Sequence, residues 1–280
     1  MTEVALGYRV FQVVKYATFF LLSLNIGFFF AEELATARLT TQAAGEAFLS
    51  FQLFSATLDT IAWVVLLILF ELETAVIPDH RLVGALRYSI HGIRMICTAG
   101  IITAFMGYFG EWQTLLGSTP LAAPACSLVD DGWSIMLKLD DFMPLTADNC
   151  AQFGADTSAV SGLEQVLAAP AGLQAAQRLA FVDVINAGVW ILVVVLLEIE
   201  VRVLSRWGGA PRLMAFAANS LKGLFYATLF AAAVYWGFKG KFLDVWDASL
   251  WLFAFVFIEL NVFEWQQEIR DQSSASRNLS

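Results

Sequence analysis

Six apolar segments, each close to the length that crosses a lipid bilayer, constrain this chain more than any other feature. A transmembrane helix needs about 20 predominantly apolar residues. Charged residues make up 15% of the chain, whereas a soluble domain carries about 25%. The sequence therefore predicts an all-α integral membrane protein with six transmembrane helices, over residues 11–31, 52–74, 85–109, 179–203, 213–237 and 244–265.

The even-numbered segments share one motif: Asp or Asn, three residues, Trp, seven residues, Glu, one residue, then Glu or Asn. Its copies are Asp59, Trp63, Glu71 and Glu73; Asn186, Trp190, Glu198 and Glu200; and Asp247, Trp251, Glu259 and Asn261. The odd-numbered segments begin with a weaker motif, a polar residue and then a base one helical turn later, at Gln12 and Lys15, His91 and Arg94, and Asn219 and Lys222. Together these motifs predict three tandem copies of one helical hairpin, all in the same orientation.

The second hairpin is interrupted by a long polar insertion. Residues 110–178 separate its two helices and are expected to form a small, partly helical, extracytoplasmic cap. The remaining predicted units are the first hairpin at 1–80, the third span at 81–109, the fourth span at 179–210, the third hairpin at 211–270 and a polar cytoplasmic tail at 271–280.

Charge and cysteine positions predict the orientation in the membrane. Bases gather in the short loops on one side, whereas the insertion holds eight acids and only two bases. Because Lys and Arg collect on the cytoplasmic side, we expect both termini in the cytoplasm and the bacterial inner membrane as the location. Cys126 and Cys150 then lie in an oxidising compartment, where they are expected to form a disulfide. Cys97, inside the third span, is expected to be an inert packing residue.

The polar residues of the motif fall on one side of each even-numbered helix. On a helical wheel, Asp59, Trp63, Glu71 and Glu73 share an arc of about 160°. Ionisable residues in a transmembrane helix usually face the bundle interior, so this arc is expected to face inward. Asp59 and Glu71 are about 18 Å apart along the helix axis. The aspartates therefore lie toward the outside and the glutamates near the cytoplasmic boundary.

The glutamates share their depth with the bases of the odd-numbered segments. Glutamates at a helix C-terminus and bases at a helix N-terminus both oppose the helix dipole, and mutual pairing relieves both. We therefore expect salt bridges from Lys15, Arg94 and Lys222 to Glu71, Glu73, Glu198, Glu200 and Glu259. This polar ring is either a structural clamp between hairpins or part of a route for protons or small cations, whose outer end is Asp59 and Asp247. Asn186 and Asn261 take the place of carboxylates in their copies of the motif.

These features predict a channel- or transporter-like protein that moves protons or small cations across the lipid bilayer. The alternative is a non-enzymatic accessory or scaffold subunit of a larger membrane complex, which docks through the acidic insertion. Association with a second copy of the chain also stays open. Trp63, Trp190 and Trp251 are expected to pack the bundle or to anchor it at the membrane interface.

Other functional classes find little support in the sequence. The two histidines lack a nearby cysteine or carboxylate pattern, so no catalytic metal, haem or other cofactor is expected. Nucleophile motifs, phosphate-binding glycine loops and CxxC pairs are missing. An enzyme is therefore the least favoured class, and no binding to nucleic acid is expected.

Overall fold

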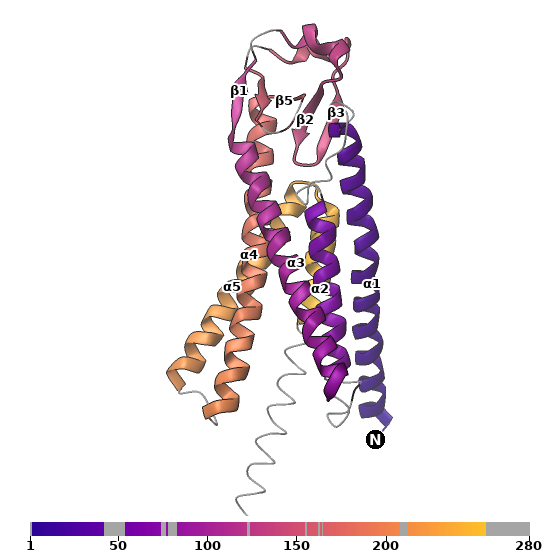
Figure 1. Cartoon of the computed structure of the whole chain (residues 1–280), viewed down its shortest axis with the longest axis vertical. Helices are drawn as coiled ribbons and strands as arrows, with labels where there is room; N and C mark the ends of the chain where they lie inside the picture. The colour runs from indigo at the N-terminus through magenta and orange to yellow at the C-terminus, as the bar shows by residue number, and fades with distance from the viewer. Residues whose placement is uncertain are drawn as a thin grey trace, which may run out of the picture.

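Helices dominate the computed structural model, and they form an elongated bundle with a small cap at one end (Figure 1). The long helices are α1 (Thr2–Thr41), α2 (Ser55–Glu71), α3 (Gly84–Leu116), α4 (Pro170–Trp207) and α5 (Arg212–Phe238). Residues 242–255 are also helical. The structure describes residues 2–41, 54–73, 77, 83–121, 124–154, 156–161, 163, 165–207 and 212–255, with side chains except at 2–9, 39–41, 200–207 and 212–215.

Successive helices alternate in direction along the bundle axis (Figure 1). Among the described residues, four helical stretches are long and apolar enough to cross a membrane: Val10–Arg38, Gly84–Leu116, Pro170–Ile199 and Phe216–Phe238. Helices suit this environment because all their backbone hydrogen bonds are made within the segment. By length and composition, these four helices are compatible with an integral membrane protein.

The two other predicted spans do not meet the same standard within the described residues. Helix α2 has 17 residues, so it is about 25 Å long, whereas the hydrocarbon core is about 30 Å thick. The sixth predicted span, 244–265, is described only up to residue 255. Six spans and a threefold repeat therefore stay predictions.

The cap, residues 117–169, contains a β-sheet, so the all-α prediction is wrong for this segment. Its strands are β1 (Ser118–Pro120), β2 (Ser134–Lys138), β3 (Asp141–Pro144), β4 (Ser158–Val160) and β5 (Val166–Ala168), in the order β1-β4-β5-β2-β3. Only the β2–β5 pair is parallel. Strands of three to five residues carry too few alternating positions to be separated from loops by periodicity. The expected helical part consists of two 3₁₀ turns, η4 (Ala125–Asp131) and η5 (Cys150–Gln152).

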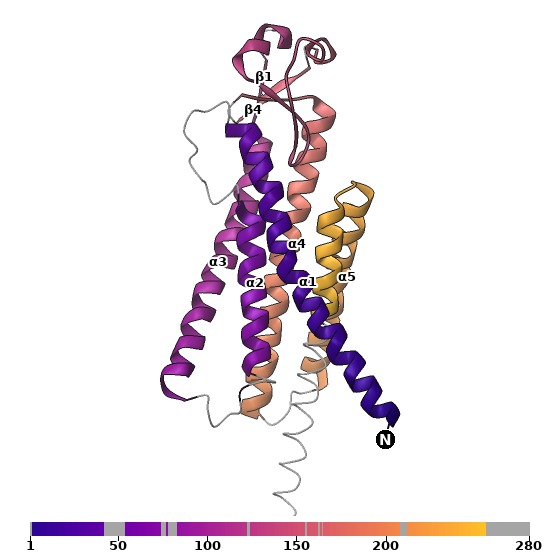
Figure 2. The ribbon, with the colours of Figure 1, turned by 90° about the vertical axis from the view of Figure 1, so that its right-hand side faces the viewer.

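One apolar core joins the cap to the helices beneath it. Met136 and Val166 of the sheet pack in a cluster with Leu115 of α3, Leu179 of α4 and Trp236 of α5, and all five are buried. Helix α4 contacts β2 and β5, and α1 contacts β3. Since α1 also runs from the opposite end of the bundle up to the cap (Figure 2), the cap is attached to the bundle from several sides.

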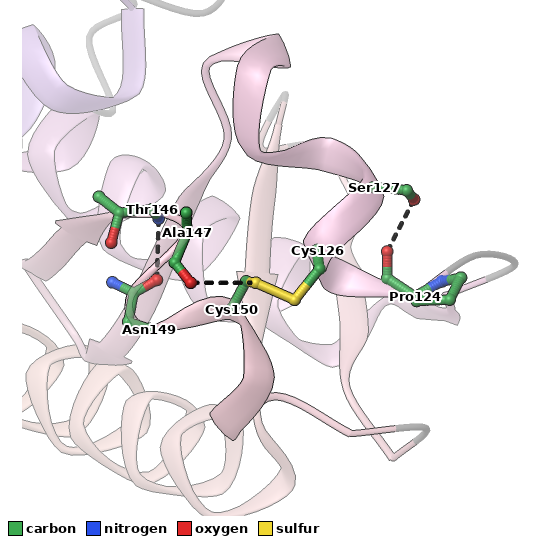
Figure 3. The surroundings of a disulfide bond; sticks show 7 residues. All are labelled: Pro124, Cys126, Ser127, Thr146, Ala147, Asn149 and Cys150. Atoms are coloured by element: carbon green, nitrogen blue, oxygen red, sulfur yellow. Dashed lines mark hydrogen bonds between the residues drawn. A yellow bond between two sulfur atoms is a disulfide. The ribbon is translucent and has the colours of Figure 1, made fainter.

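The predicted disulfide between Cys126 and Cys150 is present (Figure 3). It joins η4 to η5 beside a small apolar core that includes Ile135 and Leu167. The turn before Cys150 is fixed by Asn149, whose Oδ1 accepts the backbone N–H of Thr146 at 2.8 Å and whose Nδ2 donates to the carbonyl of Pro144 at 2.9 Å. The disulfide therefore links the two 3₁₀ turns next to the strands of the sheet.

Candidate functional site

The three motif tryptophans meet in one apolar cluster in the middle of the bundle. Trp63 of α2 and Trp251 are in edge contact with ring centroids 6.3 Å apart, and Trp190 of α4 lies 4.5 Å from the ring of Phe255. The buried aliphatic members of this tryptophan cluster include Leu22 of α1 and Leu229 of α5. Helices α1, α2, α4, α5 and residues 242–255 therefore share a single packed centre.

An outer polar level lies on the cap side of the tryptophan cluster. Asn25 of α1 is fully buried, and its Nδ2 donates to Oδ1 of Asp247 at 2.7 Å. Trp63 is hydrogen-bonded to Asp59, and Trp251 is hydrogen-bonded to Asp247, in each case one helical turn away. The motif spacing of Asp, three residues and Trp is therefore the spacing of a hydrogen bond within the helix.

The two aspartates of the outer polar level share a location and lack a counter-charge. Both side chains are partly buried, and Asp59 lies within electrostatic range of Asp247. Among the residues that the structure describes, no Lys or Arg forms a salt bridge with either carboxylate. The buried Oδ1 of Asn25 also has no hydrogen-bond partner there. This level therefore gathers oxygen atoms that can accept a proton or a cation.

The second motif copy differs at this level. Asn186 of α4 replaces the aspartate, and its buried Oδ1 has no hydrogen-bond partner among the described residues. The tryptophan of α5 instead makes an acid contact that the sequence did not suggest, because the indole N–H of Trp236 donates to Asp183 of α4 at 2.9 Å. A tryptophan and an acid are thus paired between α4 and α5 rather than within α4.

An inner polar level lies at the opposite end of α2. The Nζ of Lys15 lies 2.7 Å from Oε1 and 2.9 Å from Oε2 of Glu71, and the Tyr16 hydroxyl donates to Oε1 at 3.0 Å. Only 2% of the Lys15 side chain and 7% of the Glu71 side chain are exposed. Arg94 of α3 pairs with Glu73 in a more exposed position. Two of the predicted acid–base pairs, Lys15–Glu71 and Arg94–Glu73, are therefore present.

The rest of the predicted ring is only partly described. Glu198 and Lys222 both make contacts in the structure. The side chain of Glu200 and the residues Glu259 and Asn261 lie outside the described part of the chain.

Apolar side chains separate the two polar levels. Along α1 the order is Lys15, Leu22 and Asn25, and Leu22 is completely buried. Along α2, Leu67 of the tryptophan cluster lies between Asp59 and Glu71, which are about 18 Å apart. Within the described residues, the aspartates and the inner salt bridge are thus two separate polar sites.

A third polar group lies where the cap meets the bundle. Lys241, in the turn after α5, extends its ammonium between two carboxylates, Asp140 at 3.0 Å and Glu32 at 3.4 Å. Asp140 is at the tip of the β2–β3 hairpin with φ of 60°, and Gly240 has φ of 73°, a left-handed conformation that Gly and Asp tolerate better than most residues. Burial lowers the pKa of Lys241, but the carboxylates of Asp140, Asp244 and Glu32 outweigh it and hold this pKa above its ordinary value.

A pocket of about 210 Å³ opens at this junction, lined by Glu32, Lys138, Asp140, Asp141, Gly240, Lys241, Phe242 and Leu243. Three carboxylates and two ammonium groups thus surround a small space between α1, the cap hairpin and the turn after α5. We call this space the junction pocket. Within the described side chains, no group of three or more His, Cys, Asp or Glu is arranged to hold a metal ion.

Several residues of these sites carry no recognisable signal in the sequence. Asn25 is a lone asparagine in an apolar span, and Lys241 is a base at an expected outer turn, so neither belongs to a repeated pattern. In α1, the adjacent acids Glu32 and Glu33 at the end of the first span are the sequence feature that could have pointed to a polar site there. Comparison of the chain with known proteins finds no matching family model, no similar curated protein and no similar solved structure.

Proposed function

We propose that this chain is a channel- or transporter-like membrane protein that moves protons or small cations. The observation that carries the proposal is the pair Asp59 and Asp247, which lie near each other in the bundle without a basic partner among the described residues. Charge inside a membrane protein is costly and usually marks an ion or proton pathway. A structural role alone is better served by a paired acid, as Glu71 shows.

The proposed architecture has six spans built from three repeated hairpins, with the cap outside and both termini in the cytoplasm of a bacterium. The meeting of Trp63, Trp190 and Trp251 in one cluster supports it, because equivalent positions of a repeat around a common axis face the same centre. The disulfide of the cap supports an oxidising outer side.

In this proposal, the tryptophan cluster is the closed part of the route. A hydrophobic constriction stops ions because water leaves it, and it conducts only when it widens. The aspartates of the outer polar level would bind the proton or cation next to that constriction. The Lys15–Glu71 pair is neutralised and enclosed. For the inner ring, this favours a structural clamp between hairpins over a part of the ion route.

The test is ion flux in proteoliposomes, with H⁺, Na⁺ and K⁺ measured separately. We expect wild-type protein to conduct at least one of them, and Asp59→Asn/Asp247→Asn to lose that flux, because the amides are nearly isosteric but cannot bind a proton or carry charge. Asp131→Asn, an exposed acid of the cap, is the matched control and should keep wild-type flux. Equal flux in the double variant and in wild type would refute the proposal.

A second candidate is an accessory or scaffold subunit of a larger membrane complex. The apolar separation between the two polar levels favours it, because a closed core is what a structural subunit requires. Its docking surface would be the cap, where Asp130, Asp131, Asp148 and Asp156 are exposed. Wild-type flux no greater than that of empty liposomes, for all three ions, would favour this candidate.

A further inference from the structure

The junction pocket is placed at the outer end of a series of carboxylates. Asp244 lies within electrostatic range of Lys241, Glu32 and Asp140 on one side and of Asp247 on the other. Because residues three apart share a helix face, Asp244 and Asp247 lie one above the other on the last helix. The series continues from Asp247 to Asp59. Acidic groups therefore connect the junction pocket with the outer polar level.

The polar atoms along this series are not all satisfied within the protein. Asn25, next to Asp247, keeps its fully buried Oδ1 without a partner among the described residues. Carboxamide and carboxylate oxygens are both common ligands for hard cations. At the junction pocket, by contrast, the carboxylates of Glu32 and Asp140 already hold a cation, which is the ammonium of Lys241.

The ammonium of Lys241 has the position that an incoming cation would take. It is contributed by a turn that points toward the cap (Figure 2), and only 11% of its side chain is exposed. Its carboxylate partners come from two other elements, α1 and the β2–β3 hairpin. One side chain thus pairs with carboxylates from two elements and links all three elements at the pocket.

We propose that the junction pocket is the outer entrance for cations to the Asp59–Asp247 pair, and that Lys241 is a tethered cation that restricts this entrance. The inference rests on the proposed function. A cation entering from outside competes with the Lys241 ammonium for Glu32 and Asp140 and then passes Asp244. Clefts lined by one sign of charge concentrate counter-ions, so Lys241 lowers the local cation concentration at the entrance.

The first experiment measures cation flux in proteoliposomes for Lys241→Gln. Removal of the ammonium leaves three carboxylates and one lysine around the pocket, and we expect flux to rise by about tenfold, the lower end of the effect of electrostatic focusing. Lys241→Arg retains the charge and should stay near wild type. Lys239→Gln is the matched control. Lys239 is exposed and lies two residues before Lys241, so this variant removes the same charge outside the pocket. If wild-type flux depends on Asp59 but flux in Lys241→Gln is unchanged or lower, the inference about Lys241 is overturned while the proposed function stands.

A second experiment does not depend on flux. Leu243 lines the pocket, so Leu243→Cys reports access by a positively charged, water-soluble thiol reagent. We expect the labelling rate to rise by about tenfold when Lys241→Gln is added, and to stay constant when Lys239→Gln is added. An equal rise with a neutral reagent would show that the cap had loosened and would overturn the electrostatic account. If no variant conducts ions but the labelling rates change as expected, the proposed function is wrong, whereas the inference that the pocket attracts cations stands.

Discussion

Single residues in the bundle fall into two electrostatic classes. Lys15 and Glu71 form an enclosed pair of opposite charges, whereas Asp59 and Asp247 are two neighbouring acids that accept hydrogen bonds from indole and amide donors. An enclosed pair holds structure together, but it gains little over an apolar pair, because desolvation offsets most of the Coulomb attraction. The loss of one partner is far more damaging, since the other charge is then left buried.

This asymmetry gives a prediction for the inner pair. Lys15→Met should lower the free energy of unfolding by about 3 to 5 kcal/mol, because it leaves the Glu71 carboxylate without a counter-charge. Lys15→Met/Glu71→Leu should recover most of that loss. The measurement is reversible denaturation in mixed micelles, with each single variant compared with the double one. Additive losses in the double variant would contradict this account.

At this scale the sequence was informative where residues recur. The repeated motif placed Lys15, Glu71, Arg94 and Glu73 at one depth, and charge pairing followed from the helix dipole. It did not reveal that Asn25 would reach Asp247, which is distant in sequence. Such a contact depends on how the first and last helices face each other, and periodicity carries no information on that.

Among the elements, α2 is tied to its neighbour α1 at both ends. The N-cap residue Phe54, just before the helix, makes no side-chain hydrogen bond to it. Instead Glu33 of α1 accepts the backbone N–H of Ala56 at 2.7 Å and of Thr57 at 3.2 Å, together with the Thr57 hydroxyl. A carboxylate there satisfies free N–H groups and interacts favourably with the helix dipole. The other end of α2 is held by Lys15 of the same neighbour through Glu71.

Replacement of this cap should therefore weaken α2 from its N-terminus. We expect Glu33→Ala to cost about 1 to 2 kcal/mol of unfolding free energy, at the upper end for a helix cap. Glu33→Gln should cost less, since one oxygen still accepts a hydrogen bond. Hydrogen exchange followed by mass spectrometry should show faster exchange at the amides of Ala56 and Thr57. Unchanged exchange there in Glu33→Ala would show that the cap does not stabilise the helix.

The helices were easier to foresee than the strands. Long apolar runs predicted that α1, α3, α4 and α5 exist, because in lipid a helix satisfies all the backbone hydrogen bonds of an apolar segment. The ends of α5 agree closely with the predicted span, whereas α1 (Thr2–Thr41) extends well beyond the predicted 11–31 at both ends. The cap strands are set by pairing partners that are far apart in sequence, such as Ser134 with Val166. Local composition there, rich in Asp, Ala and turn residues, is equally consistent with a loop.

At the scale of the whole molecule, the cap and the bundle share one core. Buried residues of β2 and β5 pack with α3, α4, α5 and Ala248, and Lys241 ties the β2–β3 hairpin to α1. Such an arrangement does not have the exposed, contact-poor linker that separates independent domains. Cap and helices should therefore respond together when the cap is weakened.

The disulfide offers a way to test this coupling. Cys126→Ser/Cys150→Ser opens a loop with a sequence separation of 24 residues, which should cost about 3 kcal/mol. Calorimetry in detergent should show one transition at lower temperature in this variant. Cys97→Ser, which leaves the disulfide intact, is the control for loss of a cysteine. Two separated transitions would mean that the cap unfolds by itself.

The attachment of α2 to α1 at both ends also bears on how the chain is made. The ribosome delivers α1 before α2, so Lys15 and Glu33 are already present when Glu71 and Thr57 emerge. Helix α2 is short and has acids at its C-terminal end, so by itself it is a poor substrate for insertion by the translocon. Beside α1, the carboxylate and the free amides of α2 find their partners. We therefore expect α1 and α2 to enter the bilayer together and later helices to pack against this pair.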